Sequence, residues 1–215
     1  SGRLQWLDRC EPAGSGRRFN DGRVDRQGRF WAGTMVEDAT RAGPYSAGLY
    51  CLGADGRAQR RESGIGIANG LCWSPDGHTL YFADSPRHAI YAYDFDVDSG
   101  RIGNRREFAR TGPGVEPDGS CVDAEGGLWN AQWGAGRVLR YAPDGRVLET
   151  LETPGALQPT CVAYAGPALD LLCVPSARVG LSPAALAAQA HAGDLFVYQA
   201  GVRGLRESRA RWPAA

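Results

Sequence analysis

The chain of 215 residues carries 24 basic and 24 acidic side chains, and every basic residue is an Arg. The absence of Lys excludes Schiff-base catalysis and phosphate-binding loops that depend on a Lys. A net charge of zero without a basic run argues against nucleic acid or an anionic membrane surface as the partner, and no apolar run reaches the ~18 residues of a membrane span. The expected ligand is a small molecule.

Short aromatic or alternating runs, bounded by Gly, Asp-Gly or Pro, recur along the chain and have the length of β-strands. In chain order they are GRFWAGT (28–34), AGLYCL (47–52), HTLYFADS (78–85), AIYAYDFD (89–96), GGLWNAQW (126–133), GRVLRYAPDG (136–145), LDLLCVP (169–175) and GDLFVYQ (193–199). Only residues 181–192 have helical character, with Ser182 and Pro183 typical of a helix start. The predicted fold class is therefore all-β, with one short helix.

The six cysteines form no CxxC pair and lie mostly among apolar or alternating residues. Zinc sites and disulfide frameworks are usually marked by regular Cys spacings, which this chain lacks. We expect these cysteines to be small buried side chains in a reducing compartment. No secretory leader is visible at the start of the sequence, so the expected location is the cytoplasm.

An internal repeat organises the predicted strands. Three segments align, NDGRVDRQGRFWAGT from Asn20, NGLCWSPDGHTLYFAD from Asn69 and DGSCVDAEGGLWNAQ from Asp118, with a spacing of 49 residues in both intervals. A weaker fourth copy starts near Gln158. A β repeat of about 40–50 residues is the signature of propeller blades. Because equivalent residues of successive blades converge on the central axis, the polar residues that open the repeats are predicted to share one site.

The residues that open the repeats have two interpretations. Asp21, Asn69 and Asp118 each precede Gly, and Asn-Gly or Asp-Gly is a common hairpin-turn signal. Their constant place before an inner strand instead favours ligands, because carboxylate and amide oxygens bind hard cations. Three further Asp-Gly pairs fall between strands and are predicted to be plain turns: Asp55, Asp76 and Asp144.

No nucleophile elbow of the GxSxG type and no Ser-His-Asp order is present, and the three His are scattered. Hydrolytic chemistry in this chain would therefore need metal-activated water or a carboxylate base.

Four segments in the same order resemble the regucalcin (senescence marker protein) and gluconolactonase family. They are RRFNDGRVDRQGRFWAGTM (17–35), IANGLCWSPDGHTLYFADS (67–85), EPDGSCVDAEGGLWNA (116–131) and PSARVGLSP (175–183), so that the resemblance extends over nearly the whole chain. It implies a six-bladed propeller with one divalent cation in the central channel, and hydrolysis of sugar-acid lactones by metal-activated water. The sequence does not choose among Ca²⁺, Zn²⁺, Mg²⁺ and Mn²⁺.

The same resemblance assigns roles to individual residues. Asn69 and Asp118 correspond to the metal ligands, and Asp118 also to the proposed catalytic residue. Arg18 and Asn20 correspond to the residues of the RFND motif that contact the substrate. A further substrate-contacting Glu of the family corresponds to Asp38, one methylene shorter, with a glutamate directly before it.

The chain also departs from the family. Residues 1–215 read as a single propeller domain of about four to five blades, and the family's N-terminal Glu ligand, in a Gly-Glu-Gly/Ser-Pro context, has no counterpart. An open arc would leave strand edges and apolar blade faces uncovered, which favours self-association. A non-catalytic cation-binding propeller and an inactive fragment or interaction module therefore stand as alternatives to the lactonase. The scaffold would also suit other esters or organophosphates.

Overall fold

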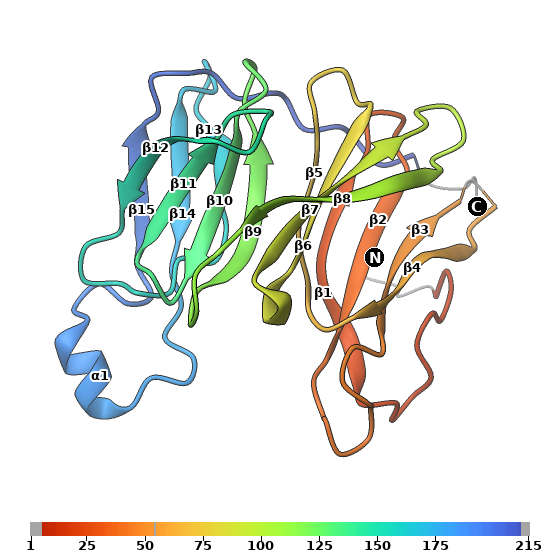
Figure 1. Cartoon of the computed structure of the whole chain (residues 1–215), viewed down its shortest axis with the longest axis horizontal. Helices are drawn as coiled ribbons and strands as arrows, with labels where there is room; N and C mark the ends of the chain where they lie inside the picture. The colour runs from red at the N-terminus through yellow and green to blue at the C-terminus, as the bar shows by residue number, and fades with distance from the viewer. Residues whose placement is uncertain (1–5, 54, 212–215) are drawn as a thin grey trace, which may run out of the picture.

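Four antiparallel sheets stand around an arc in the computed structural model, which describes residues 6–53 and 55–211 (Figure 1). The first sheet contains β1 (Arg17–Val24), β2 (Phe30–Val36), β3 (Ala47–Leu52) and β4 (Ala58–Ile65), and the second β5 (Ala68–Trp73), β6 (Thr79–Asp84), β7 (Ala89–Phe95) and β8 (Ile102–Arg110). The third contains β9 (Glu116–Val122), β10 (Leu128–Trp133), β11 (Arg137–Tyr141) and β12 (Val147–Glu152), and the fourth β13 (Ala163–Ala165), β14 (Leu171–Pro175) and β15 (Leu195–Gln199). The prediction of an all-β propeller is confirmed, and the described residues form four blades.

The core lies between neighbouring sheets, where the aromatic strands of the repeat face one another. Trp31, Trp73 and Phe95 form a cluster between the first two sheets, with ring centroids 5.6–6.0 Å apart. Trp129 is fully buried in the cluster that joins the third and fourth sheets. Because each large aromatic side chain removes about 150–250 Å² of surface from water, these clusters hold the sheets together and fix the angle between them.

The first strand of every complete sheet lies on the inside of the arc, and β5 packs between β1 and β9. Each of these three strands carries a β-bulge in which two of its residues oppose one residue of the next strand. The bulged pairs are Asn20–Asp21, Gly70–Leu71 and Asp118–Gly119. The repeated Asn-Gly and Asp-Gly pairs therefore lie within inner strands, in or directly beside a bulge, and not in hairpin turns.

Gly70 is required by the approach of two inner strands. Its φ is +62°, and a Cβ at this position would lie 2.8 Å from Ser120 Oγ and 3.1 Å from the carbonyl oxygen of Asp118. A side chain would push β5 away from β9 and strain the backbone. The Asn-Gly pair of the second repeat thus marks a close approach of strands.

The three Asp-Gly pairs that were predicted to be turns lie in the tight hairpin loops of their sheets. Each Asp accepts a hydrogen bond of 3.0 Å from the backbone N–H two residues later, as Asp side chains do in turns. The prediction for Asp55, Asp76 and Asp144 is confirmed.

The segment after β15 returns across one end of the inner strands to the first sheet, along the upper edge of Figure 1. Ala124 N donates to Arg203 O at 2.8 Å, and Arg211 N donates to Gly28 O at 2.8 Å. Between these two contacts Arg23 Nη2 pairs with Glu207 Oε1 at 3.3 Å. The opposite end of the inner strands carries the residues of the predicted site, on the side from which the β2–β3 loop and α1 (Pro183–Ala188) project.

The helix, the cysteines and the fourth repeat each differ in detail from what the sequence predicts. The helix is shorter than predicted, and Ser182 Oγ caps it by accepting from Ala185 N at 3.2 Å. All six cysteines are free, three of them buried and three half-buried. The weaker fourth repeat keeps a fully buried Val162, but residues 158–162 form only an isolated bridge, Pro159 with Ser176. Within the described residues, none of the helices has the length and apolarity needed to cross a membrane.

Candidate functional site

Two asparagines from successive repeats meet at the open end of the inner strands. Asn20 Nδ2, on β1, donates to Asn69 Oδ1 at 3.1 Å and to Ala68 O at 2.9 Å, both on β5. Asn69 is only 7% exposed, whereas Asn20 faces the solvent. The repeat therefore brings these two predicted site residues together, as propeller symmetry requires.

The other end of the Asn69 amide is held by the third repeat through a hydroxyl. Asn69 Nδ2 donates to Ser85 Oγ at 2.8 Å, and Ser85 Oγ donates to Pro117 O at 2.9 Å. Ser85 is the first residue of the short 3₁₀ helix η1 (Ser85–Arg87), and Pro117 directly precedes Asp118 on β9. The two predicted metal ligands are thus connected through one buried hydroxyl group.

Asp118 and Asp21 supply two carboxylates to this end of the channel. Burial, reinforced by the negative charges of Asp21 and Glu116, raises the pKa of Asp118 to about 7, although the neighbouring Gly119 N–H opposes the shift. Burial also raises the pKa of Asp21, and the hydrogen bond from Leu71 N at 3.0 Å acts against it. In the part of the chain that the structure describes, neither carboxylate forms an ion pair. The positive charge of Arg23 lowers the pKa of Asp21 in part, whereas no cation of the described residues acts on Asp118, so the excess negative charge of the two carboxylates favours binding of a cation.

Arg18 and a glutamate stand at the rim of the site. Arg18 Nε pairs with Glu37 Oε1 at 2.7 Å, and Arg18 Nη1 lies 3.4 Å from Asn20 Oδ1. Both partners of the ion pair are exposed, 48% for the Arg side chain and 59% for the Glu. This rim offers N–H donors and carboxylate acceptors side by side, an arrangement that can hold the hydroxyl groups of a sugar.

Asp38, predicted as a further substrate contact, is not brought to this rim. Its carboxylate accepts hydrogen bonds from Thr40 and pairs with Arg41 Nε at 3.2 Å, and the Thr40 bonds lower its pKa. A short Asp side chain bonds readily to the backbone two residues later, so that it closes its own turn. The structure instead places Glu37, the residue before it, against Arg18.

Ser85 was not assigned to the site from the sequence, and Asp21 was weighed only as one of three residues that could be ligands or turns. The bulge in which Asp21 lies depends on strand pairing. The position of Asp21 next to Asn20 in the first repeat was the available signal. Ser85 lies at the end of the aromatic strand of the second repeat, 16 residues after Asn69, and nothing in its local sequence indicates a contact with the site.

The oxygen donors at this end suit a hard divalent cation. Asn69 Oδ1 and the Asp118 carboxylate are of the ligand type that Ca²⁺, Mg²⁺ and Mn²⁺ prefer, with the second carboxylate of Asp21 nearby. Among residues 6–53 and 55–211, no group of three or more His, Cys, Asp or Glu is arranged to hold a metal ion. The described residues therefore provide a partial shell of oxygen ligands.

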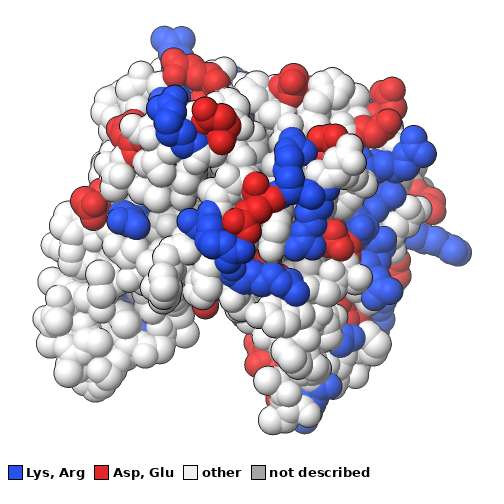
Figure 2. Space-filling model, in the orientation of Figure 1, with Lys and Arg blue, Asp and Glu red and all other residues white. Residues whose placement is uncertain are grey.

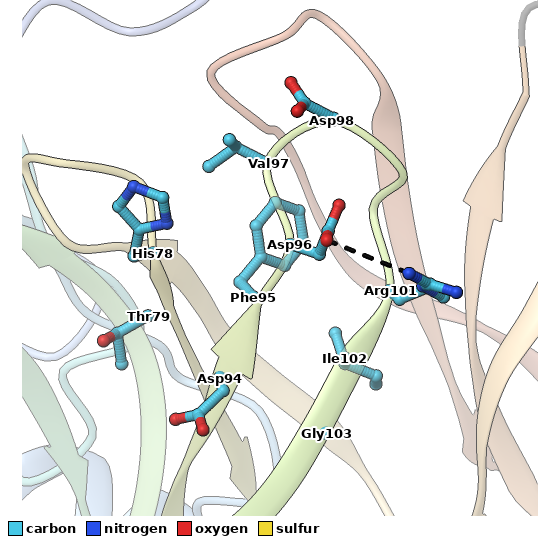
Figure 3. Close-up of a pocket in the computed structure, with 10 residues that line it drawn as sticks. All are labelled: His78, Thr79, Asp94, Phe95, Asp96, Val97, Asp98, Arg101, Ile102 and Gly103. Atoms are coloured by element: carbon cyan, nitrogen blue, oxygen red, sulfur yellow. Dashed lines mark ion pairs between the residues drawn. The ribbon is translucent and has the colours of Figure 1, made fainter.

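A large surface pocket lies elsewhere, at the β7–β8 turn, and Figure 3 shows that Asp and His side chains line it. Two of its carboxylates have Arg partners, because Asp96 pairs with Arg101 at 4.0 Å and Asp94 with Arg106 at 2.8 Å. On this face of the molecule Arg side chains lie beside Asp and Glu, whereas the region of α1 shows few charges (Figure 2). None of the predicted site residues lines this pocket.

Comparison with known proteins agrees with this architecture. A family model described as SMP-30/Gluconolactonase/LRE-like region matches residues 1–178. The L-arabinolactonase of Azospirillum brasilense is 44% identical over 194 residues, which cover 89% of this chain and 63% of the relative. The 6-deoxy-6-sulfogluconolactonase of Pseudomonas putida is 42% identical over 193 residues, covering 88% of this chain and 64% of the relative.

Among solved structures, a calcium-binding protein, regucalcin, from Agrobacterium tumefaciens superposes with a TM-score of 0.84 at 37% identity. The match covers 91% of this chain and 65% of that protein. The chain thus spans 63–64% of the length of the two lactonases.

Proposed function

Because the chain belongs to the SMP-30/gluconolactonase/LRE-like family, we propose that it carries the central site of a metal-dependent lactonase that opens sugar-acid lactones. The observation that supports this function best is the contact of Asn20 with Asn69, whose amide is linked through the Ser85 hydroxyl to Pro117, the residue before Asp118. Lactonases at 42–44% identity favour the same reaction.

Asn69 Oδ1 and the Asp118 carboxylate would hold the cation, with Asp21 adding negative charge beside them. A divalent cation at this point supplies Lewis-acid polarisation of the lactone carbonyl and lowers the pKa of a nearby water. The calcium-binding description of the regucalcin relative supports a cation of this hard class.

Asp118 acts as the proton acceptor in the proposed reaction. It takes a proton from the attacking water, the water oxygen forms a bond to the lactone carbonyl carbon, and the ring C–O bond breaks. The proton then passes to the leaving ring oxygen, so that one water is consumed and a hydroxy acid is formed. A carboxyl with a pKa of about 7 in the cation-free site is suited to exchanging protons near neutral pH.

Arg18, Asn20 and Glu37 orient the substrate. The Arg18–Glu37 pair presents donors and an acceptor to neighbouring ring hydroxyls, and the exposed Asn20 amide adds a further polar contact next to the cation site. Glu37 takes the place for which Asp38 was predicted, because Asp38 is engaged in its own turn.

The test is lactone opening by Asp118→Ala, assayed with sugar-acid lactones in the presence of Ca²⁺, Mg²⁺, Mn²⁺ or Zn²⁺. Loss of a positioned proton acceptor costs about 10²–10⁴-fold, and loss of a ligand adds to it. The matched control is Asp144→Ala, which changes another Asp-Gly pair, in the β11–β12 turn, and should retain turnover. Unchanged metal-dependent turnover in Asp118→Ala would remove this residue from the mechanism.

A second candidate function is cation binding without catalysis. The calcium-binding description of the regucalcin relative favours it. Tight binding of Ca²⁺ that depends on Asp118, with no lactone turnover under any of the four cations, would select this candidate over the lactonase.

A further inference from the structure

Ser85, which is only 2% exposed, joins the two predicted ligand strands through its hydroxyl group. Its oxygen lies 2.8 Å from Asn69 Nδ2 on one side and 2.9 Å from Pro117 O on the other. A backbone carbonyl can only accept hydrogen bonds, so that the single hydroxyl proton of Ser85 points to Pro117. The Ser85 oxygen must then accept from Asn69, and the end of the Asn69 amide that faces Ser85 is its NH₂ group.

A second carbonyl fixes the same orientation from the other side. Asn20 Nδ2 lies 2.9 Å from Ala68 O, which again can only accept. The NH₂ group of Asn20 therefore also faces Asn69 at 3.1 Å and donates to its oxygen. Two independent carbonyl groups thus determine which end of the Asn69 amide is oxygen and which is nitrogen.

We propose that Ser85 is a positioning residue that holds the Asn69 side chain with its oxygen, and not its NH₂ group, directed to a bound cation. The inference rests on the proposed function, because it concerns a ligand of the same cation site. Only one end of an amide can ligate a cation, so that a flipped Asn69 would present two N–H donors to it. A carboxylate at this position would need no such control, because its two oxygens are equivalent.

The surroundings of Ser85 keep it in place. The preceding Asp84 is fully buried, accepts from the backbone N–H groups of Gly66 and Ile67 at 3.1 Å, and binds Arg87. These bonds fasten η1 to the segment that enters β5, one residue before the start of that strand. The hydroxyl is thus positioned by contacts that do not involve the ligands, as a supporting residue for a metal site must be.

The test compares the affinity of Ca²⁺ and Mn²⁺ for wild type and Ser85→Ala by isothermal titration calorimetry. Loss of a hydrogen-bond partner of a metal ligand typically weakens binding about 10–100-fold, and we expect a loss of that size. The same substitution in an Asn69→Asp background should change the affinity by only a few-fold, since either carboxylate oxygen can face the cation. A large loss of affinity in the wild-type background and a small one in the Asn69→Asp background would show that Ser85 orients the Asn69 amide. A general loosening of the fold would instead weaken cation binding equally in both backgrounds.

Thr153→Val is the matched control. Thr153 is also 2% exposed and its hydroxyl donates to a backbone carbonyl, Ala156 O, at 2.8 Å, but it has no contact with Asn69. We expect its cation affinity to equal that of wild type. If Ser85→Ala does not fold, Ser85→Cys keeps a side chain at this place with a much weaker donor and carries the same expectation.

The outcomes separate the inference from the function on which it rests. Equal affinity of wild type and Ser85→Ala would overturn the role of Ser85 and leave the cation site standing. Equal losses on Ser85→Ala with and without the Asn69→Asp substitution would also overturn it, as damage to the fold. No cation binding by the wild-type chain would overturn the cation site itself, and the role of Ser85 with it.

Discussion

Two pairs of aspartates in and directly after β1 and β9 differ in how their negative charge is compensated. Asp21 and Asp118 lie in the bulges of β1 and β9, half-buried and without an ion-pair partner in the described chain. Asp25 and Asp123 directly follow the ends of these strands and are fully buried. The fully buried pair, Asp25 and Asp123, is the one whose carboxylates have hydrogen-bond and ion-pair partners.

The partners of the deeper pair are the same in both blades. Asp123 accepts from Trp129 Nε1 at 2.9 Å and from Arg140 Nε at 2.8 Å, as well as from two backbone N–H groups of its turn. Asp25 accepts from the indole N–H of the equivalent Trp at 3.0 Å and from Arg29 Nε at 2.6 Å. Burial of a repeated carboxylate therefore does not by itself indicate function. The signal is burial without a cation or enough donors to stabilise the charge.

The largest effect that tests this comparison is a change in the free energy of unfolding. Asp123→Ala removes one partner of a buried ion pair, leaves the Trp129 indole N–H without an acceptor and leaves Arg140 paired, among the described residues, only with Glu125, so we expect the free energy of unfolding to fall by about 3–5 kcal/mol. Asp118→Ala should not lower the free energy of unfolding in cation-free buffer, since no ion-pair partner within the described residues is lost and the cost of burying its carboxylate is removed. Urea denaturation of both variants measures the difference, and equal losses would show that the two aspartates do not differ in role.

A smaller effect is expected at Arg23, which joins the inner strands at their covered end. Its Nη1 group donates to Leu71 O and Ser120 O, and its Nη2 group pairs with Glu207. Arg23→Met leaves two carbonyl groups without this donor and should cost about 1–3 kcal/mol in urea denaturation.

The matched change at the same contact is Glu207→Gln, which should cost less than about 1 kcal/mol because the Glu side chain is 61% exposed. A larger loss in Glu207→Gln than in Arg23→Met would contradict the assignment of the stabilisation to the two carbonyl bonds.

The last effect is a dependence of stability on pH to which Asp118 contributes, together with Asp21, whose pKa is also raised by burial. The pKa of Asp118 rises from 3.8 in the unfolded chain to about 7 in the folded one, so that between these values the folded state binds more protons. The folded state therefore gains its full stabilisation from this proton below the pKa of the unfolded chain. That stabilisation is lost as the pH rises through the pKa of the folded chain. Urea titrations of cation-free protein across this window should show a downward slope that is shallower in Asp118→Asn, which keeps the contribution of Asp21. Parallel pH profiles of the two proteins would place the pKa of Asp118 near its ordinary value.

Much of the fold was accessible from the sequence because its aromatic strands bury one or both faces. The second and third strands of each sheet, such as β6 and β7, show this pattern and were predicted. The outermost strands of the complete sheets, β4, β8 and β12, are largely exposed and polar, and they were not. A strand that buries little surface leaves no hydrophobic alternation, so only its pairing with a neighbour reveals it.

The candidate site could be predicted from the sequence only where its residues occupy equivalent positions of the repeat. Asn20, Asn69 and Asp118 occupy equivalent places at a spacing of 49 residues, and the spacing alone indicated that they share an axis. The prediction of a substrate contact at Asp38 rested on a gapless correspondence, which cannot show that Asp38 bonds within its own turn while Glu37 pairs with Arg18.

By itself, the sequence determined the all-β class, the period of the blades and the three polar residues that open the inner strands, because strand periodicity and repeat spacing are local properties of the chain. Only the tertiary structure decided which carboxylates are neutralised and which remain without a cation, and which end of the Asn69 amide carries its oxygen. These properties depend on partners such as Ser85 and Trp129, which the fold brings into contact by strand pairing and by the close approach of β5 and β9.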